Sequence, residues 1–266
     1  MKSSLSEIKG VVIDMDGVLR RGGNALPGVK EFFNILRQRE IKLILATNNS
    51  TVTPEAVVAL MNSMDVSIRP EEMIGSAQAT AAYLQQHYPA GTPTLILGEE
   101  ALHAAVEQAG LRLVSDPLIA EVVISGFNRQ MDYSLLTRMA IAIQNGAAFI
   151  GTNPDKSFPL EEWNAPGNGA ILAALEATTG AAPLIIGKPE PHLYKQCLRR
   201  MHTIPAETLA LGDRLDTDIL GGQRTGMPTA LVLTGISSEA EIALSGIQPD
   251  WVFPGLPELT TALREI

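Results

Sequence analysis

Short apolar runs rich in β-branched residues alternate with helix-like patterns along most of the chain. The strand candidates are residues 11–13, 41–45, 94–97, 122–125, 148–151, 184–186, 209–211 and 228–232. The helix candidates are residues 29–39, 55–64, 99–108, 134–144, 169–178, 191–201, 218–225 and 258–265. Strands separated by helices pair in parallel, and strands without polar alternation are covered on both faces. The pattern therefore predicts an α/β fold with a doubly wound parallel sheet.

Length and composition restrict the class of protein. At roughly 150 residues per domain, the 266 residues correspond to about 1.8 domains. Hydrophobic residues make up 45% and charged residues 18% of the chain, as in ordinary globular proteins, which excludes a disordered or fibrous chain. The longest apolar runs, 56–61 and 170–175, are far shorter than the roughly 18 residues of a membrane span. We therefore expect no part of the chain to cross a membrane.

Charge and cysteine content exclude further classes. The chain carries 20 basic and 29 acidic residues, a net charge of −9, which disfavours a nucleic-acid polymer or an anionic membrane as a partner. Cys197 is the single cysteine, and the four histidines are scattered, so neither an internal disulfide nor structural zinc is expected. Residues 1–9 mix charged residues with serines and have no apolar core. They therefore do not resemble a signal peptide, and we expect a cytoplasmic location.

Polar side chains gather where four of the predicted strands end, which is where parallel α/β sheets bind ligands. The four segments are Asp14-Met15-Asp16-Gly17, Ala46-Thr47-Asn48-Asn49-Ser50, Gly187-Lys188-Pro189-Glu190-Pro191 and Gly212-Asp213-Arg214-Leu215-Asp216-Thr217-Asp218. Each segment alone has a structural explanation as a turn, a helix cap or a solvated lysine. Together they provide hard oxygen ligands for magnesium and fixed positive charge for phosphoryl oxygens.

The order and spacing of these segments resemble the four motifs of the haloacid dehalogenase superfamily, over residues 11 to about 235. Three phrases narrow the resemblance to the NagD-type, p-nitrophenylphosphatase-like subfamily. They are Thr152-Asn153-Pro154-Asp155, Gly187-Lys188-Pro189 and the segment from Gly212 to Asp218.

The resemblance implies a role for each acid of the first motif. Asp14 is the expected nucleophile, which takes the phosphoryl group as an aspartyl-phosphate. Asp16 is the expected general acid and base, first for the leaving alcohol and then for the hydrolytic water. Mg²⁺ is the expected cofactor, held by Asp14, by the main-chain carbonyl of Asp16 and by Asp213.

The other motifs supply the phosphate site. Thr47, the amide of Asn48 and Lys188 are expected to hold the equatorial oxygens of the transferring group. Asp218 is expected to orient either a metal-bound water or Lys188. Asp216 is either a further member of the site or a helix N-cap, and the sequence leaves both open.

The spacing of the motifs predicts an inserted domain. Asp14 and Thr47 are 33 positions apart, about one βα unit, whereas Thr47 and Lys188 are 141 positions apart. We assign residues 1–78 and 184–266 to a catalytic core and residues 79–183 to a smaller α/β cap. The β-phosphoglucomutase-like branch has its cap between the first two motifs, where only a short loop is available here, so a mutase is not expected.

A cap excludes water and places side chains over the leaving group. The expected specificity residues are Asn153, Asp155 and Trp163, the last in the loop 158–164. A packed loop with a buried aromatic is the alternative interpretation.

The predicted function is a magnesium-dependent phosphatase acting on small phosphomonoesters through an aspartyl-phosphate. Sugar phosphates, nucleoside monophosphates and p-nitrophenyl phosphate are the expected substrate types. Two alternatives stay open: a phosphotransferase using the same intermediate, and a non-catalytic phosphate-binding regulatory protein. The subfamily resemblance also suggests a homodimer, which the composition does not test.

Overall fold

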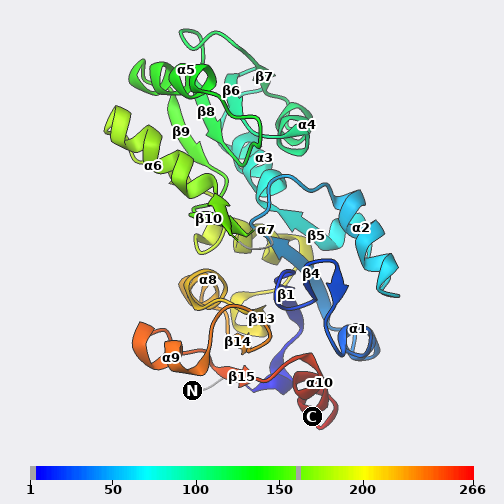
Figure 1. Ribbon diagram of the computed structural model, residues 1–266. Helices are drawn as coiled ribbons and strands as arrows, with labels where there is room; N and C mark the ends of the chain where they lie inside the picture. The colour runs from blue at the N-terminus through cyan, green and yellow to red at the C-terminus, as the bar shows by residue number, and fades with distance from the viewer. Residues whose placement is uncertain (1–3, 160–162) are drawn as a thin grey trace. The chain divides into compact units, whose positions relative to one another are not determined.

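The structure, a computed structural model, describes residues 4–159 and 163–266. The chain forms two compact units (Figure 1). The first unit contains Met1–Thr47, Pro54–Ile74 and Lys188–Ile266, and the second contains Asn48–Thr53 and Gly75–Gly187. The boundary that we drew between residues 78 and 79 falls inside helix α3 (Ser76–His87), which belongs entirely to the second unit.

The first unit is built on a six-stranded sheet in the order β15-β14-β13-β1-β4-β5. Its strands are β1 (Gly10–Ile13), β4 (Lys42–Thr47), β5 (Met73–Gly75), β13 (Thr208–Gly212), β14 (Thr229–Val232) and β15 (Trp251–Phe253). Strand β1 pairs in parallel with both β4 and β13, so that Ile13 lies opposite Leu45 and Leu211. Every residue of β1, β13 and β14 is buried. These strands are therefore covered on both faces, as their continuous apolar character predicts.

Helices surround this sheet. They are α1 (Val29–Gln38), α2 (Pro54–Ser63), α7 (Pro191–Met201), α8 (Leu220–Thr225), α9 (Glu239–Ser245) and α10 (Leu256–Arg264). Helix α1 packs on α10, and α7 packs on α8. The apolar positions of α1 recur at helical spacing, and Val29, Phe32, Phe33 and Leu36 are all buried. A short antiparallel hairpin, β2 (Arg20–Arg21) and β3 (Asn24–Ala25), follows the first motif.

The second unit has its own parallel sheet, in the order β12-β9-β8-β6-β7. Its strands are β6 (Pro93–Leu97), β7 (Arg112–Leu113), β8 (Val122–Ser125), β9 (Ala148–Gly151) and β12 (Leu184–Ile185). The assignment of residues 184–186 to the first unit is wrong, because Leu184 and Ile185 pair with Ile150 and Gly151 of β9. The chain therefore returns to the first unit only at Lys188.

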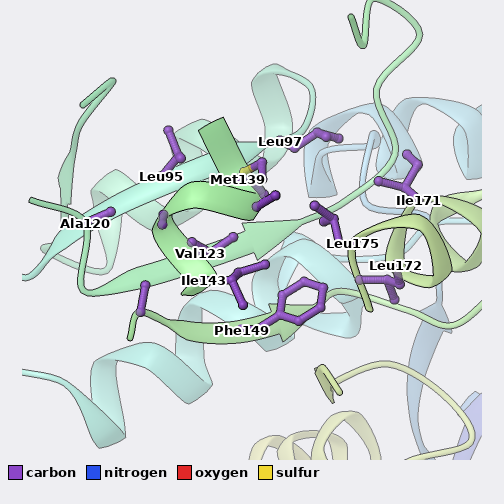
Figure 2. Packing of buried hydrophobic residues seen from close by; sticks show 13 residues of the cluster. Leu95, Leu97, Ala120, Val123, Met139, Ile143, Phe149, Ile171, Leu172 and Leu175 are labelled. Carbon is purple, nitrogen blue, oxygen red and sulfur yellow. The ribbon is translucent and has the colours of Figure 1, made fainter. Parts of the chain in front are cut away.

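Helices cover both faces of this second sheet, with α5 and α6 on one side and α3 and α4 on the other (Figure 1). The helices other than α3 are α4 (Glu100–Gln108), α5 (Tyr133–Gln144) and α6 (Asn168–Thr179). Figure 2 shows the core between the sheet and α5 and α6, where Val123 and Phe149 of the strands meet Met139, Ile143 and Leu172 of the helices. The unit therefore has a hydrophobic core of its own. A hairpin, β10 (Ser157–Pro159) and β11 (Asn164–Pro166), precedes α6.

The predicted α/β fold with parallel sheets is confirmed. One element differs in kind: the helix predicted over 218–225 is a π-helix over Leu215–Ile219 followed by α8. Within the described ranges, no helix combines the length and the apolar character that a membrane span requires.

Candidate active site

Three carboxylates of the first unit converge at the carboxyl ends of its central strands. Asp14 follows β1, Asp213 follows β13, and Asp218 lies in the π-helix; each offers an oxygen within 4.8 Å of the others. The strand register produces this convergence, because the Asp14 amide donates a hydrogen bond of 2.9 Å to the Leu211 carbonyl of β13. Two predicted metal ligands, Asp14 and Asp213, therefore lie together with Asp218.

Lys188 lies among these acids. Its Nζ donates to Asp14 Oδ1, to Asp218 Oδ1 at 2.7 Å and to the carbonyl oxygen of Ala46 at 3.1 Å. The lysine side chain is only 4% exposed. The structure thus places the predicted phosphate-binding lysine against the predicted nucleophile, and it places Asp218 against the lysine.

Burial and the neighbouring charges shift the pKa values of the groups in this cluster. Burial raises the pKa of Asp14 well above its usual value, and the carboxylates of Asp218 and Asp213 raise it further, although Lys188 opposes both effects. Burial and Asp218 likewise raise the pKa of Asp213 to about 6. Burial alone would lower the pKa of Lys188, but the adjacent Asp14 and Asp218 raise it well above its usual value.

Three carboxylates, the buried Asp213 and Asp218 and the partly buried Asp14, therefore cluster around the Lys188 ammonium group. An additional cation would favour the ionised forms of Asp14 and Asp213, whose pKa values are raised. Carboxylate oxygens at this spacing are the ligands that Mg²⁺ prefers. The residues present therefore fit a magnesium ion.

A loop after β14 holds Asp213 in place. The Ile236 amide donates to Asp213 Oδ2 at 2.8 Å, and the Ser237 amide donates to the Asp213 carbonyl at 3.0 Å. A Cβ atom on Gly235 would lie 1.8 Å from Asp213 Oδ2, and one on Gly17, whose φ is +82°, would lie 2.4 Å from the same oxygen. Sequence reasoning missed this loop because it contains no titratable residue.

Replacing Gly235 with Ala is expected to displace the Asp213 carboxylate, because no Cβ can occupy a position 1.8 Å from a carboxylate oxygen. We expect magnesium-dependent phosphate release to fall at least about tenfold, the effect of misplacing one group of a catalytic site. Gly23→Ala is the control, because its Cβ would meet no atom within 4 Å. Equal activity of the two variants would show that the close packing around Asp213 is not required.

The position of Asp218 also depends on its surroundings. A Cβ on Gly212 would lie 2.1 Å from the Asp218 Cβ, so only glycine permits this approach. The Arg214 amide donates to Asp218 Oδ2 at 3.2 Å, and the buried Tyr194 hydroxyl donates to the Asp218 carbonyl at 3.1 Å. Tyr194 lies on α7, outside every motif, and nothing in the sequence separates it from a packing residue.

Asp216 lies outside the cluster. Its carboxylate pairs with Arg214 at 2.8 Å, and its side chain is 67% exposed. The interpretation of Asp216 as a helix N-cap is also wrong, because the N-cap position of the π-helix is Arg214.

Asp16, the predicted acid and base, is exposed. Its side chain is 61% exposed, and Asp16 Oδ1 lies 2.9 Å from Arg20 Nε of the β2–β3 hairpin. Its carboxylate is therefore directed to the hairpin and is not one of the three clustered acids.

The two residues of the second motif belong to different units. Thr47 is the buried last residue of β4, two positions beyond Leu45, which lies opposite Ile13. Thr47 therefore reaches the same end of the sheet as Asp14. Asn48 is the first residue of the second unit, where its carbonyl accepts from Ser76 Oγ at 2.6 Å and from Asn153 Nδ2 at 2.8 Å.

The three expected specificity residues have different environments. Asn153 is buried, and its amide is used within the second unit by the bond to Asn48. Asp155 is partly buried and accepts a hydrogen bond of 3.3 Å from Asn48 Nδ2. Trp163 is 76% exposed, which does not fit the alternative interpretation as a buried aromatic. Residues 160–162 of the same loop lie outside the described residues.

Two family models match separate stretches of the chain. The family model of haloacid dehalogenase-like hydrolases matches residues 11–112, and a HAD-hydrolase-like model matches residues 185–259. An acid sugar phosphatase from Staphylococcus aureus (strain USA300) is 36% identical over 261 residues, which cover 98% of this chain and 100% of that protein.

Two solved structures are similar over most of the chain. NagD from E. coli K-12 has a TM-score of 0.88 and 33% identity, covering 94% of this chain and 98% of its own. A glycerol phosphate phosphatase from Mycobacterium tuberculosis, in complex with magnesium, has a TM-score of 0.87 and 32% identity, covering 99% of this chain and 78% of its own.

The fold, the acid cluster with its lysine and these relatives together define the class of protein as a phosphomonoester hydrolase. The chain belongs to the haloacid dehalogenase-like hydrolase family, and within it to the NagD-type branch that the motifs predicted.

Proposed function

We propose that this protein is a magnesium-dependent phosphatase that hydrolyses small phosphomonoesters through an aspartyl-phosphate. The observation that carries the proposal is Lys188, buried in contact with Asp14 and Asp218 beside Asp213. This arrangement supports Asp14 as the nucleophile, Lys188 as a fixed positive charge and the clustered acids as oxygen ligands. The enzyme is a phosphomonoesterase of the haloacid dehalogenase type.

Asp14 attacks the phosphorus of the bound ester, a P–O bond to the carboxylate forms, and the P–O bond to the alcohol breaks. Asp16 gives its proton to the departing oxygen. A water molecule then attacks the aspartyl-phosphate, Asp16 takes a proton from it, and inorganic phosphate leaves with Asp14 restored. Asp16 must turn from Arg20 to reach the leaving oxygen, and its exposure leaves room for this.

The remaining motif residues hold the phosphoryl group. Lys188 supplies positive charge beside Asp14, and Asp218 fixes the position of its ammonium group through the bond of 2.7 Å. The Thr47 hydroxyl and the Asn48 amide are proposed as donors to the equatorial oxygens. The Tyr194 hydroxyl stabilises the position of Asp218 by donating a hydrogen bond to the Asp218 carbonyl.

Asp14, Asp213 and the main-chain carbonyl of Asp16 would hold the magnesium ion. The ion supplies positive charge that offsets the repulsion between the carboxylates and the phosphate. The protein groups themselves keep this site in shape, since the Ile236 amide and the packing of Gly17 and Gly235 fix Asp213.

We further propose that the second unit acts as the cap and selects the leaving group. The exposed Trp163 provides an apolar surface, and Asp155 provides a carboxylate that hydroxyl groups of a substrate can donate to. Asn153 has a different role in this proposal: it fixes the carbonyl of Asn48 and so the segment that joins the units. The names of the relatives, a sugar phosphatase and a glycerol phosphate phosphatase, support small polyol phosphates as substrates.

The test is phosphate release from a panel of phosphomonoesters in magnesium and again in excess chelator. We expect p-nitrophenyl phosphate and polyol phosphates to be hydrolysed, with at least about a 100-fold loss on chelation, because metal charge neutralisation contributes several kcal/mol. Magnesium should also raise the melting temperature, since a ligand that binds only the folded state stabilises it. Undiminished hydrolysis in chelator, without a thermal shift, would refute the metal site.

A further inference from the structure

Arg20 brings a guanidinium group to the proposed general acid. The residue lies in β2, four positions after Asp16, and its Nε is 2.9 Å from Asp16 Oδ1. Its Nη1 donates to the Gly22 carbonyl at 3.3 Å across the hairpin turn. Arg20 therefore lies beside the group that, in the proposed function, protonates the ester oxygen of the substrate.

The hairpin that carries Arg20 is hydrogen-bonded to the loop after β14, which also positions Asp213. Arg21 Nη2 donates to the Thr234 carbonyl at 2.5 Å, and Thr234 Oγ1 donates to the Gly17 carbonyl at 2.6 Å. Thr234 directly precedes Gly235, which packs against Asp213. The backbone around Arg20 is thus tied to the same loop that positions a proposed metal ligand.

The guanidinium group is only partly satisfied by the protein. The Nε atom is buried but forms no well-directed hydrogen bond to any described residue, despite its close contact with Asp16. The arginine side chain is 25% exposed. A guanidinium has five N–H donors in a planar fork that matches a carboxylate, so Arg20 retains capacity for a ligand.

We propose that Arg20 forms a subsite for a second anionic group on the substrate, a carboxylate close to the phosphate ester. This proposal rests on the proposed function, because it needs Asp16 to meet the ester oxygen. When Asp16 turns to that oxygen, Arg20 loses its carboxylate partner, and a substrate carboxylate replaces it. Hydrogen-bond lengths place such a carboxylate roughly two to four bonds from the ester oxygen.

Two phosphate esters test the subsite directly. 3-Phosphoglycerate and glycerol 3-phosphate share a three-carbon skeleton with the phosphate on a terminal carbon, but only the first has a carboxylate. We expect wild-type enzyme to have the higher kcat/KM for 3-phosphoglycerate. Arg20→Met should lower that kcat/KM by about 10- to 100-fold, the effect of losing a hydrogen bond between charged groups, and should change glycerol 3-phosphate less than about threefold.

Two further variants separate a lost contact from a damaged site. Arg20→Lys keeps the charge and should recover part of the activity on 3-phosphoglycerate. Lys30→Met removes one positive charge from an exposed position on α1 and should leave the ratio of the two substrates unchanged. Circular dichroism verifies the folding of each variant.

Three outcomes overturn the subsite. The first is an equal loss on both substrates in Arg20→Met, which would mean that Arg20 acts only by holding Asp16. The second is no loss on either substrate, and the third is a wild-type enzyme without preference for the carboxylate. Failure of wild-type enzyme to hydrolyse any ester, p-nitrophenyl phosphate included, would instead refute the proposed function.

Discussion

Replacing Asp14 with Asn is expected to lower phosphate release from p-nitrophenyl phosphate by at least about 1,000-fold, as removal of a nucleophile does in other covalent mechanisms. The amide has nearly the shape of the carboxylate but cannot form the acyl phosphate. The measurement is steady-state phosphate release in saturating magnesium.

The fold should survive this substitution. Asp14→Asn removes one of the three clustered acids, while Lys188 keeps its bond to Asp218. The melting temperature in chelator should therefore stay equal or rise. Asp65→Asn is the matched control: this exposed aspartate lies at φ +58°, a conformation that Asn also adopts readily, and its activity should be that of wild type. Activity of Asp14→Asn above about a tenth of wild type would exclude the aspartyl-phosphate mechanism.

The central features of the site are predictable because parallel strands bring their carboxyl ends to one edge of a sheet. Apolar runs identify β1 and β13 and so put the acids that follow them, Asp14 and Asp213, at the same edge of the sheet. The structure makes these acids neighbours because β1 pairs with β13. Lys188 could be predicted only from the resemblance to a family. The strand before it, β12, belongs to the second sheet. The argument that Lys188 follows a strand of the same sheet as Asp14 would therefore have been wrong.

The residues that hold these groups could not be predicted from their own chemistry. Gly235 acts because it has no side chain, and Ile236 acts through its backbone amide. Glycines and backbone amides occur throughout the sequence, so neither feature marks these two positions. Tyr194 is 24 residues from Asp218 in sequence, and only the packing of α7 brings its hydroxyl to the Asp218 carbonyl. Arg20 faces Asp16 because of a hairpin of two-residue strands, too short for any periodic pattern.

The division into units was predicted in outline from the 141 positions between Thr47 and Lys188, but its limits were not. Helix α3 was missed because its buried residues include the small Ala77, Ala79 and Ala81, which give only a weak apolar pattern. The segment Asn48–Thr53 joins the second unit because of its hydrogen bonds, such as those from Ser76 and Asn153 to Asn48, which composition does not reveal.

Replacing Lys188 with Met is expected to destabilise the protein as well as inactivate it. Asp14 and Asp218, whose side chains are 13% and 3% exposed, would lose the cation they share. Removing one partner of a buried ion pair typically costs about 3–5 kcal/mol of unfolding free energy. The cost should increase with pH, because at low pH a proton can neutralise a carboxylate whose pKa burial has raised. Urea denaturation in chelator, at several pH values, measures this loss.

The double variant Lys188→Met with Asp218→Asn separates charge balance from catalysis. Removing one of the two stranded carboxylates should restore most of the lost stability, because a neutral amide costs less to bury than an unpaired charge. Phosphate release should stay as low as in the single variant, since the Lys188 ammonium group then no longer faces the phosphoryl oxygens beside Asp14. If the double variant were no more stable than Lys188→Met, the acids would not depend on Lys188 for their charge balance, and the case for a magnesium ion as the remaining counter-charge would weaken with it.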